Sequence, residues 1–238
     1  MESIDGARTP ESEIVEKIRT PIDERFSFVV RTRPAPGPRY RGQKTAPDIV
    51  EATIEDSESG NVAVDLGTLL REVSKIGRSA SFVLDKEFTA RSPLRLVEIS
   101  ERELLDPKEI FALLHELGHI TADDKRDEDQ RGEVSRLHSA QDPSNQELLM
   151  LIQDERDAWA QAITLARLIK KERGVDLFKL FQGPDEFMGW YRDTGLRTYE
   201  KELEERGIGA YTKEDKVRAW QKSQGATPVS PDDFEPAG

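Results

Sequence analysis

Residues 106–121 of the chain read DPKEIFALLHELGHIT and predict the helix on which the fold depends. Asp106 as an N-cap, Pro107 as the first helical residue and Glu109 three positions after the cap are typical of a helix start. The apolar residues of this stretch fall on more than one side of the helix and predict that it is buried: Ile110, Phe111, Leu113, Leu114 and Leu117. The helix should end where the charged residues 123–133 break the pattern.

The same helix carries His115 and His119, with Glu116 beside the first. Residues four apart on a helix lie one turn apart and about 40° from eclipsed, so both imidazoles can reach one metal ion at about 2.0–2.1 Å. Glu116 projects at a neighbouring angle and can act on a water molecule there without being a ligand. The alternative is a chance motif with two surface histidines. Imidazoles beside a buried helix need partners, however, and a metal ion supplies them, so the pattern favours a metal site.

A catalytic zinc site of this kind takes a third protein ligand and leaves a fourth position open. The chain contains no cysteine, so that ligand must be a histidine or a carboxylate. The metzincin pattern has a histidine where this chain has Lys125, which excludes that arrangement. We predict Glu155 as the third ligand, on a long helix expected over residues 144–173. It is the lone carboxylate in an apolar stripe formed by Leu148, Ile152, Trp159, Ala162 and Ala166.

Other assignments stay open. Glu155 could form a buried ion pair with an arginine instead. His138, expected in a polar loop, and Asp157, expected on a polar helix face, are the other candidate ligands, although a solvated side chain is the simpler interpretation of each. The sequence does not choose the group that would stabilise negative charge on a substrate carbonyl among Tyr191, Tyr199, Tyr211 and His138.

The HELGH helix follows a strand expected at residues 94–99 and precedes a helix with ERDAWAQA at residues 155–162. This arrangement resembles the gluzincin type of HExxH zincin metallopeptidase, and within it the ImmA/IrrE-like metallopeptidase family, over residues 94–166. The resemblance implies an α+β, zincin-like fold. A small sheet would pack on the HExxH helix, a second long helix would carry a ligand, and additional helices would follow toward the C-terminus. Trp159 departs from the family pattern, which usually has a supporting Asn or Asp there, and Gln161 replaces an aromatic residue.

The resemblance also implies an activity and its residues. Zn²⁺ would be held by His115, His119 and Glu155, with Glu116 as the general base of a zinc metalloendopeptidase that hydrolyses peptide bonds with a metal-activated water. The substrate would be a protein or peptide, and by analogy a specific intracellular regulator. The alternatives are a metal-containing regulatory or binding module without peptidase turnover, and a structural helical protein in which HELGH is coincidental.

Composition limits the partners of the chain. The formal net charge of −12 disfavours polyanions, so no nucleic acid is expected as a direct partner. No apolar run approaches the roughly 20 residues of a membrane span, so no membrane is expected either. Residues 1–6 have neither a basic nor an apolar stretch, which predicts no signal peptide and a cytoplasmic location. The sequence does not indicate whether the chain forms oligomers.

Along the chain the sequence predicts three parts. Residues 1–46 form a proline-rich, partly irregular segment, with a short helix at 11–19 and a strand at 26–30. Residues 47–222 form the zincin-like metallopeptidase domain, with a further strand at 79–84 and further helices at 65–77, 185–206 and 213–222. Residues 223–238 are expected to be a disordered tail.

Overall fold

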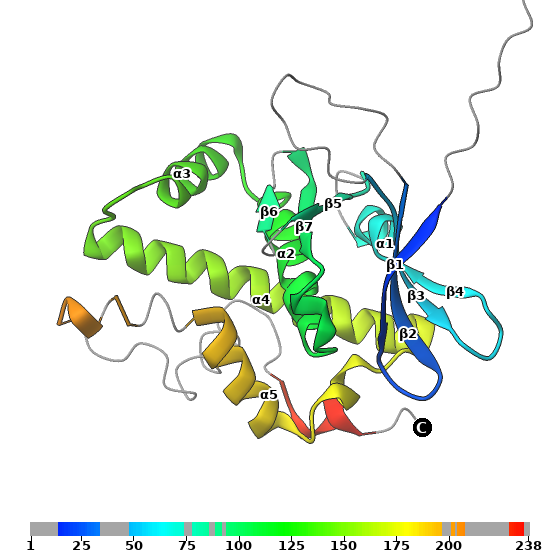
Figure 1. Cartoon of the computed structure of the whole chain (residues 1–238). Helices are drawn as coiled ribbons and strands as arrows, with labels where there is room; N and C mark the ends of the chain where they lie inside the picture. The colour runs from blue at the N-terminus through cyan, green and yellow to red at the C-terminus, as the bar shows by residue number, and fades with distance from the viewer. Residues whose placement is uncertain are drawn as a thin grey trace, which may run out of the picture.

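The structure, a computed structural model of the chain, describes residues 14–33, 48–73, 78–85, 89–91, 94–196, 201–202, 204–207 and 229–235. Within these residues the expected α+β class is confirmed, since one small sheet lies beside a group of helices (Figure 1). No helix in this part of the chain is both long and apolar enough to cross a membrane.

The sheet contains seven strands. Their bounds are Val15–Pro21 (β1), Phe26–Arg33 (β2), Asp48–Asp56 (β3), Val62–Asp65 (β4), Ser81–Asp85 (β5), Thr89–Arg91 (β6) and Leu96–Ser100 (β7). The order is β1-β2-β3-β5-β7-β6, with β4 paired to β3. All these pairs are antiparallel except β5 with β7. The strands expected at 26–30, 79–84 and 94–99 are thus confirmed as β2, β5 and β7.

The short helix expected at residues 11–19 is wrong where the structure describes it, because this part of the chain forms β1. Ile18, Thr20 and, just after the strand, Ile22 are buried, and this alternation of β-branched residues suits a strand. The hydroxyl of Thr20 also donates to the carbonyl oxygen of Leu104 at 2.6 Å. Pairing with β2 and burial of one face therefore outweigh the helical spacing of the local sequence.

β1 and β2 share one sheet with β3, so the described part of the segment at residues 1–46 is continuous with the strands that follow it. The rest of that segment, residues 1–13 and 34–46, lies outside the described residues. The boundary at residue 46 stays a prediction.

Five α-helices lie in the described part of the chain: Leu66–Val73 (α1), Glu109–Asp123 (α2), Glu128–His138 (α3), Asn145–Arg173 (α4) and Pro184–Tyr191 (α5). The helices expected at 106–121 and 144–173 are confirmed as α2 and α4, and the helix expected at 65–77 is confirmed as α1 up to Val73, since residues 74–77 lie outside the described residues. Ser144 caps α4, and Gly174 ends it in the left-handed conformation at a φ of 69°. α2 begins at Glu109 rather than at Pro107, because the backbone bonds of the preceding turn span three residues, from the N–H of Glu109 to Asp106 and from the N–H of Ile110 to Pro107.

α3 occupies a charged stretch for which the sequence predicts no helix. Its N-cap Asp127 accepts from the backbone N–H of Gln130, whose side chain accepts in return from the N–H of Asp127. Only Leu137 of α3 is buried, against a small apolar cluster on α4, so little hydrophobic periodicity marks this helix. The prediction of a loop around His138 is therefore wrong, since His138 is the last residue of α3.

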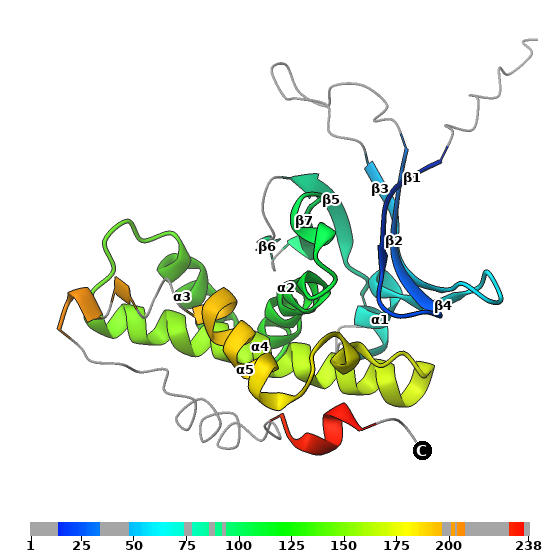
Figure 2. The ribbon, with the colours of Figure 1, turned by 60° about the horizontal axis from the view of Figure 1, so that its bottom comes forward.

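Beyond α4 the chain returns toward that helix. α5 and the π-helical turn Arg192–Leu196 cover the first part of the helix expected at 185–206, and the helix expected at 213–222 lies outside the described residues. Residues 229–235, for which the sequence predicts disorder, instead pack against α4 (Figure 2). Asp233 accepts two hydrogen bonds from Arg167, at 2.8 and 2.7 Å, and the ring of Phe234 lies 5.4 Å from that of Phe178.

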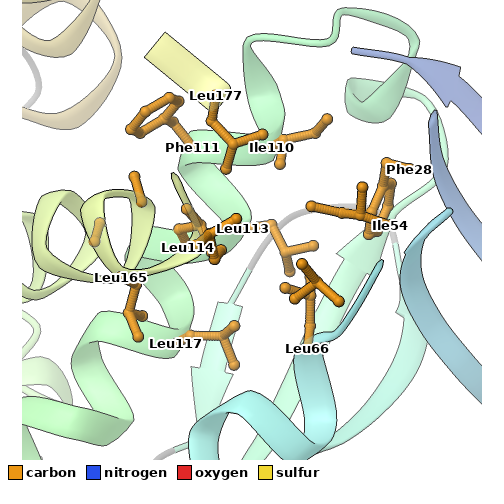
Figure 3. Packing of buried hydrophobic residues seen from close by; sticks show 14 of the residues in the cluster. Phe28, Ile54, Leu66, Ile110, Phe111, Leu113, Leu114, Leu117, Leu165 and Leu177 are labelled. Carbon is orange, nitrogen blue, oxygen red and sulfur yellow. The ribbon is translucent and has the colours of Figure 1, made fainter. Parts of the chain in front are cut away.

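α2 lies in the interior, in contact with β6, β7 and α4. The burial expected for this helix is confirmed. Figure 3 shows Leu113, Leu114 and Leu117 of α2 within the apolar cluster that also holds Leu165 of α4 and Leu66 of α1. The core of the molecule is therefore built around the helix that carries the HELGH motif.

α2 and α4 approach one another closely at Gly118. A Cβ atom at this position would lie 2.1 Å from the carbonyl oxygen of Ala158 and 2.9 Å from its carbonyl carbon. Both are backbone atoms and cannot move aside as a flexible side chain can. Gly118 therefore allows a crossing of the two helices that no other residue type would permit.

We predict that Gly118→Ala destabilises the protein by about 3 kcal/mol or more, because the added methyl group forces the two helices apart. Gly132→Ala is the matched control, since Gly132 lies within α3 and a Cβ there would meet nothing within 4 Å. Gly132→Ala should stabilise the fold by about 0.5–1 kcal/mol through its helix propensity. Urea unfolding measures both, and similar effects of the two substitutions would contradict the close contact.

A second prediction concerns Glu109 at the start of α2. Burial raises the pKa of Glu109 to about 7, helped by the charges of Asp106 and Glu103 and opposed by a hydrogen bond with Trp190. The unfolded chain ionises at lower pH than the folded one, so stability should fall as pH rises from about 4.5 to 7. Since the side chain is partly solvated, the free energy of unfolding of Glu109→Gln should increase by about 1 kcal/mol relative to that of wild type between pH 5 and pH 8. Urea unfolding at both pH values tests this, and a constant difference would refute it.

Candidate metal centre

The crossing of α2 and α4 brings His115 and His119, on α2, to Glu155, on α4. His115 is 7% exposed and Glu155 is 8% exposed, so both side chains are withdrawn from solvent. Grouped in this way, the two histidines and the carboxylate could hold a metal ion. The structure thus places together the three residues that the sequence predicts as ligands. Their binding of zinc stays a prediction.

The candidate ligand atoms lie close to one another. Nε2 of His115 is 3.1 Å from Nε2 of His119 and 3.0 Å from Oε2 of Glu155. Nε2 of His119 is 3.6 Å from the same carboxylate oxygen. Ligands held about 2.0–2.1 Å from a tetrahedral zinc ion are about 3.3 Å apart. The three distances lie around this value, so the two imidazoles and the carboxylate fit three corners of a zinc tetrahedron.

The charges of the cluster favour a cation. Burial alone lowers the pKa of His119, but Glu155 and Asp154 outweigh it and raise this pKa well above 6.5. Burial alone raises the pKa of Glu155, but His119 and His115 bring it below 4.5. Two imidazole nitrogens 3.1 Å apart also repel one another unless a proton or a metal ion lies between them. The site therefore holds an ionised carboxylate and requires positive charge beside it.

Glu116 lies next to the cluster without belonging to it. Its Oε1 is 3.9 Å from Nε2 of His115, farther than either contact of Glu155 with the histidines. Its side chain is 12% exposed. This exposure is close to that of His119 and Glu155, so it is the position of Glu116 beside the candidate ligands that suits a group that exchanges protons.

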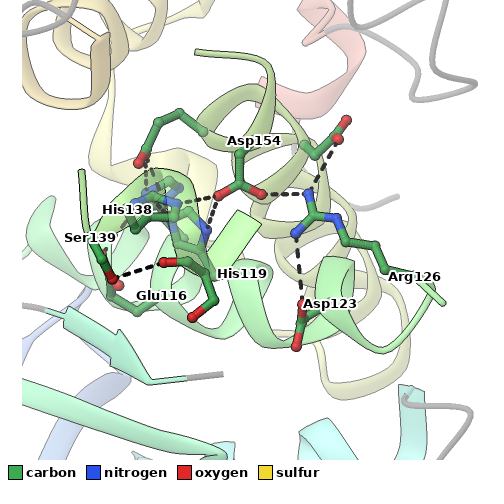
Figure 4. Close-up of polar contacts among 11 residues, drawn as sticks. Glu116, His119, Asp123, Arg126, His138, Ser139 and Asp154 are labelled. Carbon is green, nitrogen blue, oxygen red and sulfur yellow. Dashed lines mark hydrogen bonds and ion pairs between the residues drawn. The ribbon is translucent and has the colours of Figure 1, made fainter. Parts of the chain in front are cut away.

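Asp154, the residue before Glu155, is a member of the site that the sequence analysis missed. It is 3% exposed, and its Oδ2 lies 3.4 Å from Nδ1 of His119 and 2.7 Å from Nε2 of His138, while Arg126 donates to its Oδ1 (Figure 4). A signal for its burial was present, because Leu151 and Ala158 stand three residues before it and four residues after it, and both are apolar.

The two histidines have different surroundings. The ring of His115 stacks on Trp159, with 4.5 Å between the ring centroids and 24° between the planes. Its Nδ1 is buried and has no hydrogen-bond partner among the described residues. Trp159 is itself buried against Trp190 and Tyr191. His115 is therefore held mainly by an aromatic surface, and His119 by a carboxylate.

The remaining candidates from the sequence have other surroundings. Asp157 accepts from Gln153 at 3.3 Å and lies 3.7 Å from Arg126, away from the group formed by the two histidines and Glu155. His138 is 38% exposed along its side chain and contacts Asp154. Tyr191 is fully buried, which does not suit contact with a substrate. Tyr199 and Tyr211 lie outside the described residues.

Comparisons with known proteins add no relative to this picture. A scan against protein-family models, a search of curated proteins and a search of solved structures each gave no match. The function of the chain is therefore inferred from the geometry of the site.

We predict that Glu155→Ala weakens zinc binding at least about tenfold, because it removes one of three candidate ligands. Asp157→Ala is the matched control on the same helix and should leave the zinc affinity within about twofold. Competition with a chromophoric chelator gives both dissociation constants. A large loss for His138→Ala without one for Glu155→Ala would indicate a three-histidine site instead.

Proposed function

We propose that this chain is a zinc-dependent metallopeptidase of the zincin type, with His115, His119 and Glu155 as metal ligands. The observation that carries the proposal is the set of distances from 3.0 to 3.6 Å among their Nε2 and Oε2 atoms, with Glu116 just outside the set. The small sheet, the buried HELGH helix and the crossing long helix support the zincin-like arrangement that the motif implies. This support is independent of the spacing of the motif itself.

The residues of the chain would divide the work of peptide hydrolysis. The two histidines and Glu155 would hold the metal ion. When bound, zinc supplies Lewis-acid chemistry, which polarises a carbonyl group and makes a water molecule more acidic. The carboxylate of Glu116 would accept a proton from the attacking water at Oε1 and return it to the nitrogen of the leaving amine. The low exposure of His115 and Glu155 would strengthen these electrostatic effects by excluding bulk water.

The substrate we propose is a protein or peptide, with a specific intracellular regulator as the candidate. This part rests on the resemblance of HELGH and the Glu155 helix to the ImmA/IrrE-like family, and on analogy alone. The second candidate function is a metal-containing regulatory or binding module without turnover. The limited exposure of His115 and Glu155 favours it, because a catalytic metal must admit a scissile peptide bond.

Glu116→Gln separates these two functions. The amide fits the same space but cannot accept the proton, so the variant should keep about one zinc per chain and lose about 10²–10⁴-fold in turnover. Elemental analysis measures the zinc, and a fluorescence-quenched peptide library measures cleavage. Glu109→Gln makes the same chemical change six residues before His115 on the same helix, outside the candidate ligand group, and should keep both zinc and turnover.

Two results would count against the metallopeptidase, and a third would change the roles of its residues. A wild-type protein that takes up no zinc has no such site. A wild-type protein that binds zinc but cleaves no library peptide supports the binding module. Loss of zinc in Glu116→Gln, with zinc retained in Glu155→Ala, would exchange the roles of the two glutamates.

A further inference from the structure

Asp154 joins three separate segments of the chain at one buried carboxylate. His119 approaches it from α2, Arg126 from the turn after α2, and His138 from the end of α3. Asp154 itself lies on α4, directly before Glu155, and is 3% exposed. A carboxylate with so little solvent contact requires donors from the protein, and these three residues provide them.

The contacts assign protons to the two imidazoles. A carboxylate beside a guanidinium group has acceptor atoms only, so a ring nitrogen that bonds to it must carry a hydrogen. Nε2 of His138 therefore donates to Oδ2 at 2.7 Å. Nδ1 of His119 faces the same oxygen at 3.4 Å, which favours the tautomer with hydrogen on Nδ1. In the neutral imidazole, the form that binds a metal ion, the lone pair of His119 is then left on Nε2, the atom that faces His115 and Glu155.

The carboxylate is also held in place. Arg126 binds Oδ1 while His138 binds Oδ2, so the plane of the carboxylate cannot turn without breaking one of these bonds. Arg126 is fixed in turn, since it lies 3.9 Å from Asp123 and 3.7 Å from Asp157. An acceptor fixed at both oxygens can set the orientation of the His119 ring, which a freely rotating acceptor cannot do.

We propose that Asp154 is the positioning residue of the metal site, which holds His119 with its Nε2 directed at the metal position through a carboxylate locked by Arg126 and His138. The proposal rests on the metallopeptidase assignment for its metal, but it concerns metal binding rather than turnover. It also explains the asymmetry of the site, because His115 has Trp159 in place of a fixed acceptor among the described residues.

Zinc affinity of the full-length protein tests the proposal, measured by competition with a chromophoric chelator. Asp154→Asn keeps one acceptor oxygen and should weaken zinc binding about tenfold, while Asp154→Ala keeps none and should weaken it further, toward about a hundredfold. Asp157→Asn is the matched control. Asp157 lies on the same helix near the same arginine, and the zinc affinity of Asp157→Asn should match that of wild type. Arg126 keeps Asp123 and Asp157 beside it in both Asp154 variants.

A spectroscopic measurement separates positioning from general stabilisation. In zinc-loaded protein labelled with ¹⁵N-histidine, the Nδ1–H signal of His119 should be present and slow to exchange in wild type and in Asp157→Asn. It should shift and exchange faster in Asp154→Asn. Should Asp154→Ala fail to fold, Asp154→Asn alone decides the question.

The outcomes distinguish this proposal from the proposed function. If wild type binds no zinc, the metal assignment itself fails. If wild type binds zinc and Asp154→Asn binds it equally well with an unchanged His119 signal, the metal assignment stands and the role of Asp154 is refuted. A lower melting temperature for Asp154→Asn with unchanged zinc affinity would also refute it, because Asp154 would then serve the fold only.

Discussion

The contact of Gly118 with the backbone of Ala158 is the constraint on which the rest of the structure depends. It sets how closely α2 and α4 cross, since a side chain of even one carbon would lie 2.1 Å from a carbonyl oxygen. His119 directly follows Gly118, and Glu155 lies one helical turn before Ala158, so the crossing point is also the place where candidate ligands from two helices meet. A glycine in the HELGH motif is thus explained by packing, while the histidines and Glu116 are explained by chemistry.

The candidate site lies between two environments that hold it differently. On one side Asp154, Arg126 and His138 form a polar network that reaches α3. On the other side Trp159 connects His115 to an aromatic cluster with Trp190 and Tyr191. Changes in the polar network should therefore alter the metal site more than the fold. Changes in the aromatic cluster should alter both, because truncation of a fully buried tryptophan typically costs about 3–5 kcal/mol.

The parts of the fold that the sequence predicted are those with strong local signals. α4 is bounded by a capping box at Ser144 and by Gly174, and both signals are chemical requirements of helix ends. β1 was missed because its burial depends on pairing with β2, which local spacing does not report. α3 was missed because it buries only Leu137, so it lacks the apolar stripe by which a helix is recognised. Pairing with β2 decides β1, whereas α3 begins at a local capping box between Asp127 and Gln130 and has no apolar stripe to mark the rest of the helix.

The same distinction applies within the site. His115, Glu116 and His119 were predicted because one helical turn sets their relation, and Glu155 because an apolar stripe makes a lone carboxylate conspicuous. Asp154 was not predicted, since its partners come from α2, the following turn and α3, which meet only in the folded chain. Adjacent acids on a helix point about 100° apart, so Asp154 and Glu155 can face different neighbours. One turn of α4 thereby supplies both a candidate ligand and the carboxylate that orients a second candidate ligand, His119. Both roles require the close crossing of α2 and α4 that Gly118 permits.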